Sequence, residues 1–155
     1  MAQAAPRVRA VVLLCDSAQE IGGKLYILGG GWSRIAALNP NLPIGFAVAV
    51  KLRIPWHDAN RRLALRLALF TDDNQPVLTP DGTDIHAEGT IEVGRPPGVR
   101  PGSDLDSAFV VPVAAQLAPR AYHWDLAIDG QLIEVVPFEV LPAPPGLALP
   151  GPQRP

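Results

Sequence analysis

The segment of residues 44–54, IGFAVAVKLRI, constrains the fold more than any other part of the chain because its hydrophobicity alternates without interruption. One parity carries only large apolar side chains, namely Ile44, Phe46, Val48, Val50, Leu52 and Ile54. The other parity is small or basic. Successive side chains of a β-strand point to opposite faces, so this segment predicts a strand with one face in a hydrophobic core.

The same alternation recurs along the chain, and no segment has the periodicity of a long amphipathic helix. Strands are predicted over residues 8–15, 24–36, 44–54, 62–70, 84–93, 107–117, 121–128 and 132–140. Turn-forming residues separate them, and Asp129-Gly130 is the strongest hairpin signal. Many short strands joined by such turns are typical of sandwiches and barrels. We therefore expect an all-β, mainly antiparallel β-sandwich of about eight strands, Ig-like or C2-like.

The length of 155 residues suits one domain with a single core. We expect this domain to span residues 1–141. Residues 142–155 hold six prolines and predict a flexible, polyproline-like tail. The apolar run near the N-terminus is short for a signal sequence and predicts a first strand instead.

Charge and cysteine content exclude several classes of partner. The formal net charge of −2 gives no attraction to nucleic acid or to an anionic membrane. No apolar run approaches the roughly 18 residues of a membrane span. The one cysteine, Cys15, cannot form an intramolecular disulfide, so nothing points to an oxidising compartment. We expect a cytoplasmic protein.

Four segments together resemble a family of small bacterial proteins of uncharacterised function. They are DSAQEIGGKLYILGGGW at 16–32, IPWHDANRR at 54–62, VGRPPG at 93–98 and YHWDLAIDG at 122–130. The first of them carries the signature D-x-A-Q followed by G-K-L-x-x-L-G-G-G-W. The resemblance covers nearly the whole domain and implies a bacterial, cytoplasmic β-sandwich. It implies no activity and no cofactor.

No segment matches a motif for catalysis or for a cofactor. A phosphate loop built around Gly23 and Lys24 fails because Ala18 and Leu25 stand where glycine and serine or threonine are needed. The pairs Asp84/His86 and His123/Asp125 each face outward on a strand without a third ligand. Cys15 has no base tied to it by spacing. We expect a protein that is not an enzyme, with no cofactor and no metal ligands among these residues.

The loop after residue 54 holds the most varied chemistry of any loop, because Trp56, His57, Asp58 and Asn60 lie within five positions. These residues are candidates for binding a ligand or partner. The alternative is that Asn60 or Asp58 caps a short helical turn while Trp56 plugs the end of the sandwich.

Three further candidates lie between residues 16 and 32. If the first three predicted strands each cross the whole sandwich, Asp16 and Glu20 emerge beside Trp56. Trp32 follows three glycines, at 29–31, and either anchors a partner or folds over the core.

Two functions remain open on the sequence alone. The first is a non-enzymatic structural or protein-interaction module that forms a homo-oligomer or binds a protein partner. It rests on the outward positions Gly45, Ala47 and Ala49, which are small enough for another layer to approach closely. The alternative is a domain that binds a small ligand or calcium at the loop end near Asp16 and Trp56. Calcium would draw on loop carboxylates, for which the chain offers Asp72, Asp73, Asp81, Asp84, Asp104 and Asp106.

Overall fold

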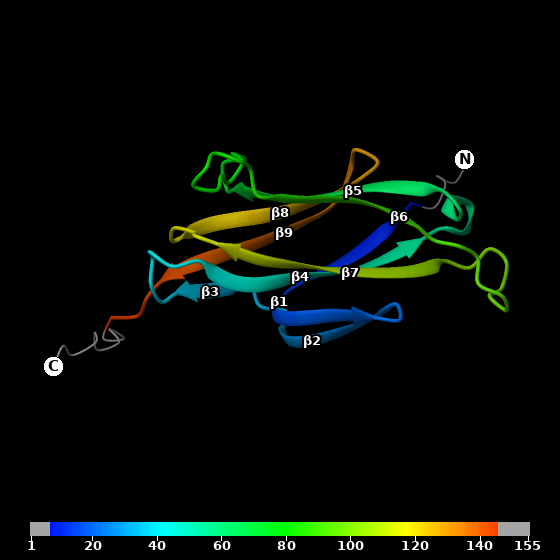
Figure 1. Cartoon of the computed structure of the whole chain (residues 1–155), viewed down its shortest axis with the longest axis horizontal. Helices are drawn as coiled ribbons and strands as arrows, with labels where there is room; N and C mark the ends of the chain where they lie inside the picture. The colour runs from blue at the N-terminus through cyan, green and yellow to red at the C-terminus, as the bar shows by residue number, and fades with distance from the viewer. Residues whose placement is uncertain (1–6, 146–155) are drawn as a thin grey trace, which may run out of the picture.

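The computed structural model describes residues 7–145, which form nine β-strands and no α-helix (Figure 1). The strands are β1 (Arg9–Ile21), β2 (Lys24–Gly30), β3 (Arg34–Ala37), β4 (Ile44–Ile54), β5 (Arg62–Thr71), β6 (His86–Glu92), β7 (Leu105–Ala115), β8 (Arg120–Ile128) and β9 (Gln131–Pro142). A 3-10 turn, η1 (Trp56–Asp58), follows β4. No helix in this part of the chain is long and apolar enough to cross a membrane.

The strands build two sheets that face each other, which confirms the predicted all-β sandwich (Figure 1). The first sheet has the order β2-β1-β4-β7 and the second has the order β3-β9-β8-β5-β6. All pairs are antiparallel except β3 with β9, which run parallel. The last predicted hairpin forms as expected, because Asp129 and Gly130 both adopt positive φ between β8 and β9.

The core between the sheets is built by the predicted parities. The inward residues of β4 from Phe46 to Ile54 are buried, as are Leu63, Leu67 and Leu69 of β5. Ile44 and Leu65, on the same parities, are partly buried. From β8, Tyr122, Trp124, Leu126 and Ile128 join the same cluster, and β9 adds Phe138 and Val140. Edge-to-face contacts of Phe46 with the rings of Trp32, Trp124 and Phe138 fill one end of this core.

The predicted strand over residues 24–36 is wrong in one respect, because it forms two strands in different sheets. β2 pairs with β1, whereas β3 lies beside β9 in the opposite sheet. The glycines between them make this crossing possible. Gly29 has a φ of 58°, and a Cβ at this position would collide with the carboxylate of Asp16. The described part of the chain therefore has nine strands where about eight were expected.

The hairpin of β1 and β2 forms a partial third layer. β1 pairs with β4 from Arg9 to Cys15, and from Cys15 onward it pairs with β2. In Figure 1 the hairpin lies beneath β4 and β7, on the side away from β8 and β9. The turn at Gly22 and Gly23, with φ of 59° and 78°, has the two positive φ values of the tight turn that suits a two-residue hairpin.

This third layer covers the surface that the sequence assigned to self-association. Ala47 is 4% exposed and Ala49 is 1% exposed. They form a second, smaller cluster with Cys15, against which side chains of the hairpin and of β7 pack, namely Ala18, Leu25, Ile27 and Val110. The small residues do admit another layer, but that layer is the chain's own hairpin. The expectation that Ala47 faces another subunit is therefore corrected.

The predicted domain boundary falls close to the end of β9, which runs to Pro142. Of the predicted tail, residues 146–155 lie outside the described residues, as do residues 1–6 at the start of the chain.

Shortening a side chain in the core should lower the stability of the fold, whereas a small substitution at an exposed position of the same strand should not. Leu67→Ala removes a buried side chain of β5 and should lower the free energy of unfolding by about 2–5 kcal/mol, through lost transfer energy and a cavity. The matched control is Ala64→Ser, an exposed position on the opposite parity of the same strand. Urea denaturation of both variants measures the difference, and equal losses would contradict the parity of β5.

The hairpin layer makes a second prediction about β4. Ala47→Arg should lower the melting temperature because a long charged side chain cannot fit beneath the hairpin. Gly45→Arg is the matched control, since Gly45 lies on the same face with nothing within 4 Å of a Cβ there. Circular dichroism melts of the two variants test this. An Ala47→Arg protein as stable as the control would show that the hairpin does not cover this face.

Candidate functional site

The residues predicted to form one loop-end site lie in two separate places. Cys15, next to Asp16, pairs with Ala47, whereas Trp56 follows the far end of β4. Nine residues of extended chain at about 3.3 Å each place Trp56 roughly 25–30 Å from Ala47. The expectation that Asp16 and Glu20 neighbour Trp56 and His57 is therefore wrong. It failed because the extra strand, β3, makes β1 and β4 antiparallel.

The loop around Trp56 is tied to the segment that follows β6. Arg95 donates a hydrogen bond to the carbonyl oxygen of Trp56 at 2.9 Å, and its guanidinium lies 4.6 Å from the centroid of the Trp56 ring. The N–H of Asn60 donates to the carbonyl oxygen of Val93 at 2.8 Å, and Asn60 has a φ of 57°. These contacts hold Trp56, which is partly buried and packs against the core, to the segment that follows β6. No side chain caps the 3-10 turn.

Charged residues of the same loop are also paired within the fold. Arg61 binds Asp58 and Asp129 at 2.7 Å each, and the imidazole of His57 lies 3.5 Å from Asp58. The other carboxylate oxygen of Asp129 accepts the N–H of Ala64 at 2.9 Å. That backbone hydrogen bond, followed by the one from Arg61, holds the pKa of Asp129 below its usual value. Asp58 and Asp129 thus serve to join the loop to the turn between β8 and β9.

The three candidates near the hairpin have equally local partners. Glu20 accepts the N–H of Gly23 at 2.6 Å and so stabilises the hairpin turn. Asp16 is exposed at the bend of β1, beside Gly29. Trp32 packs edge-to-face on Phe46 and Phe138. Its indole nitrogen is buried with no hydrogen-bond acceptor, so Trp32 lies over the core rather than outside it.

The acidic residues considered for calcium are dispersed in the fold. Five of the six form ion pairs with basic side chains, which are Asp72 and Asp73 with Arg120, Asp84 with Arg66, Asp104 with Arg9 and Asp106 with Lys51. Asp81 instead hydrogen-bonds Thr79 within its own turn. Within residues 7–145, no three His, Cys, Asp or Glu side chains come close enough together to hold a metal ion.

The two outward His/Asp pairs are likewise satisfied by their neighbours. His86 lies 3.1 Å from the Asp84 carboxylate. His123 lies 2.7 Å from Asp125 and 3.0 Å from the side-chain oxygen of Asn74, and its ring stacks on Phe70. Each imidazole therefore has a carboxylate partner within the fold, and the Asp84 carboxylate is shared between His86 and Arg66.

One surface remains that the sequence did not single out: the outer face of the hairpin. Cross-strand pairing places Ser17 opposite Leu28, Gln19 opposite Tyr26 and Ile21 opposite Lys24, so these six side chains share the face that points away from β4. Ile21, Tyr26 and Leu28 are all exposed there, and Leu28 is 71% exposed. A signal was present in the sequence, because residues 25–28 are apolar on both parities, as expected of a strand with two apolar faces.

The pairing of Asp129 makes stability depend on pH. Because the pKa of Asp129 is lowered in the folded protein, its contribution is present above the unfolded value of about 4 and is lost as the pH falls through the lowered folded value. Asp129→Asn keeps a residue that tolerates positive φ but removes the charge. We expect a lower melting temperature than wild type at pH 7, with the difference shrinking as the pH falls below about 4. A difference that persists unchanged at pH 3 would contradict the role of the charge.

The proteins that this chain resembles include a partial relative and a solved structure. Over 56 residues the chain is 38% identical to the outer-membrane lipoprotein carrier protein of Vibrio parahaemolyticus, a match that covers 36% of this chain. It spans only 27% of the length of that relative. An immunoglobulin-like protein from Pseudomonas aeruginosa aligns with 89% of this chain and 99% of its own, with a TM-score of 0.46 and 16% identity.

A protein-family model identifies the family to which the chain belongs. The model of a family of unknown function, DUF6941, matches residues 10–141. This range includes all nine strands except Arg9 at the start of β1 and Pro142 at the end of β9. This agrees with the expected resemblance to an uncharacterised family. The protein therefore belongs to the DUF6941 family of unknown function.

Proposed function

We propose that this protein is a non-enzymatic interaction module that self-associates through the outer face of its β1–β2 hairpin. The observation that carries the proposal is a concentration of exposed hydrophobic residues. Ten large hydrophobic residues are exposed in residues 7–145. Three of them, Ile21, Tyr26 and Leu28, share the outer face of the hairpin, and two more, Val11 and Leu13, lie on the part of β1 that precedes it. Exposed apolar surface gathered on one part of a soluble protein commonly marks an interaction site.

The hairpin is built to present this surface firmly. Its other face packs on Ala47 and Ala49 through Ala18, Leu25 and Ile27. The backbone that carries the outer side chains is therefore held in place by β4. Apolar side chains held on rigid strands lose little conformational freedom on binding, which favours association.

A second copy of the chain is the partner that this surface suits best. The face carries three large apolar side chains and one charge, Lys24, near its end. A two-fold axis would bring identical patches together, so apolar side chains would meet apolar side chains without any further complementarity. The expectation of a homo-oligomer is thereby kept, but its surface moves from β4 to the hairpin that covers β4.

Light scattering on the purified chain tests this proposal. We expect a dimer mass at tens of micromolar and a monomer mass for Leu28→Glu, with an unchanged melting temperature because Leu28 is already exposed. Leu132→Glu is the matched control: Leu132 is 54% exposed on β9, in the opposite sheet, and its replacement should leave the dimer intact. A monomeric wild-type protein would refute self-association and leave a different protein as the partner.

A further inference from the structure

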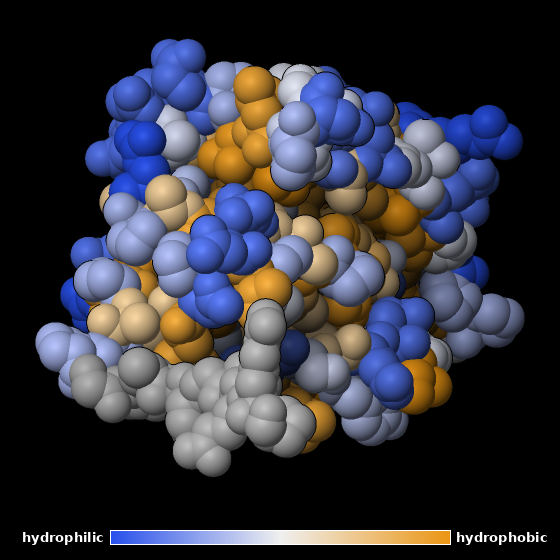
Figure 2. Space-filling view, turned by 60° about the vertical axis from the view of Figure 1, so that its left-hand side comes forward, coloured by the Kyte–Doolittle hydropathy of each residue, from blue (hydrophilic) through white to orange (hydrophobic). Residues whose placement is uncertain are grey.

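A cleft opens between the two sheets, away from the hairpin. β7 ends the first sheet and β6 ends the second, and the described residues provide no strand beyond either edge. Between these strands lies a cavity of about 560 Å³, within the range of small-molecule sites. A narrower cavity of about 210 Å³ continues along the same edge and shares Ala87 and Val111 with the first. Figure 2 brings forward the end where the cleft opens and shows hydrophobic surface recessed between hydrophilic side chains.

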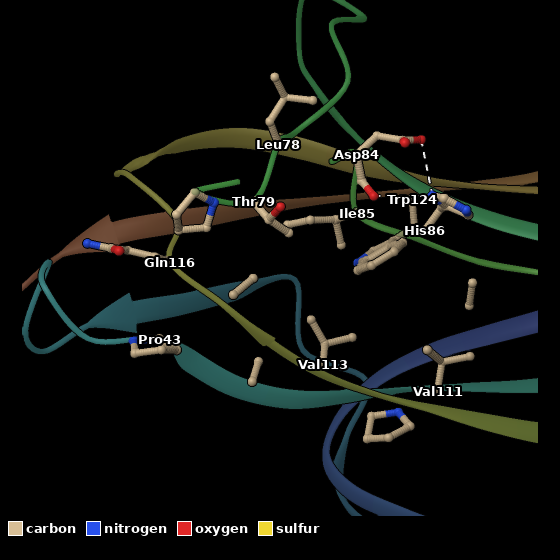
Figure 3. A pocket seen from close by; sticks show the side chains of 15 residues that line it. Pro43, Leu78, Thr79, Asp84, Ile85, His86, Val111, Val113, Gln116 and Trp124 are labelled. Carbon is tan, nitrogen blue, oxygen red and sulfur yellow. Dashed lines mark hydrogen bonds and ion pairs between the residues drawn. The ribbon is translucent and has the colours of Figure 1, made fainter. Parts of the chain in front are cut away.

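The walls of the larger cavity are mostly aliphatic. Leu78 and Ile85 come from the segment before β6, and Val111 and Val113 come from β7 on the other side (Figure 3). Asp84 and His86 lie at one end and Gln116 at the other, while the polar side chain between them, Thr79, is hydrogen-bonded to Asp81. An apolar interior with a few polar groups at its edge is typical of sites that take small molecules.

The floor of the cavity holds a hydrogen-bond donor without an acceptor. Trp124, from the middle of β8, is 1% exposed, and its indole N–H has no hydrogen-bond partner among residues 7–145. In Figure 3 the ring lies at the back of the pocket with its nitrogen on the side of Ile85 and Val113, where neighbouring atoms cover it. Buried indole N–H groups normally find a partner, because an unpaired donor in an apolar environment costs free energy. Trp32 also has an unpaired indole nitrogen, but it does not line this cavity.

The charges around the cavity select against anions. Among the described residues, no Lys or Arg lines it. At its margin the guanidinium of Arg66 binds Asp84 at 2.9 Å and also Glu88. One guanidinium between two carboxylates leaves this margin with a net negative charge, which would repel a carboxylate or phosphate, so a neutral ligand suits the cavity best.

We infer that this cleft binds a small, neutral, apolar molecule whose carbonyl oxygen accepts a hydrogen bond from the indole N–H of Trp124. The aliphatic walls take the hydrocarbon part of the ligand, and the carbonyl supplies the acceptor that the fold does not. This site is separate from the outer face of the hairpin and does not depend on self-association.

Entry to the donor requires a small movement of one wall. The indole nitrogen has almost no accessible surface, so an oxygen reaches it only when the adjoining aliphatic side chains shift. Leu78 and Ile85 belong to the segment between β5 and β6, which isolated bridges and single hydrogen bonds hold to its neighbours rather than a continuous strand. Such a segment can move without disturbing the sheets.

Three probes of similar size test the inference on the unmodified protein. Hexanophenone offers a neutral carbonyl, hexylbenzene lacks the acceptor, and 6-phenylhexanoate carries a negative charge. The chain has three tryptophans, whose indole N–H signals can be followed in ¹H–¹⁵N spectra. We expect hexanophenone to shift the Trp124 signal saturably and to bind about tenfold more tightly than hexylbenzene, the effect of one hydrogen bond. The carboxylate should bind more weakly than hexanophenone.

A pair of variants locates the site. Trp124→Phe should reduce the affinity for hexanophenone to that for hexylbenzene, whereas Trp32→Phe, which removes the other unpaired indole, should leave it unchanged. Melting curves establish that both variants are folded, and the probe comparison on the wild type stands if Trp124→Phe is not. The inference is overturned if hexanophenone leaves the Trp124 signal unmoved, if ketone and hydrocarbon bind equally, or if the carboxylate binds best.

Discussion

The structure depends on the burial of β4 on both of its faces. Its inward side chains fill the core between the sheets, while Ala47 and Ala49 are buried on the other side beneath the hairpin. β4 also pairs with β1 on one edge and with β7 along its whole length on the other. A strand enclosed in this way fixes the position of three neighbouring elements at once. The small residues on its outer face are therefore a packing requirement, since larger ones would hold the hairpin away.

The alternation of large apolar residues was sufficient to predict the sandwich and the membership of its core. Phe46, Leu67 and Trp124 are buried because parity within a strand is a local property that the sequence records directly. The same holds for the turn at Asp129-Gly130, whose residues suit positive φ. These features depend on neighbours in the sequence, and so they could be predicted.

The location of the candidate site could not be predicted in the same way. Whether Asp16 lies beside Trp56 depends on how many strands separate them, and the break at Gly29–Gly31 added one. A glycine run inside an apolar stretch is compatible with a bulge, a bend or a crossing between sheets. Only the position of β9, more than a hundred residues later, decides which of these occurs. The cleft beside Trp124 likewise forms between strands that are distant in sequence, so no local sequence pattern predicts it.

The bend of β1 also has a consequence for measuring motion. Cys15 is fully buried where β1 passes from the sheet into the hairpin, and its thiol lies 3.4 Å from the carbonyl oxygen of Ala47. Burial, followed by the charge of Asp16, raises the pKa of this thiol and keeps it in its unreactive form. Since the chain has one cysteine, the rate at which a thiol reagent modifies it reports how often the hairpin lifts from β4. The reactivity of Cys15 is thus a built-in probe of how often the outer layer opens.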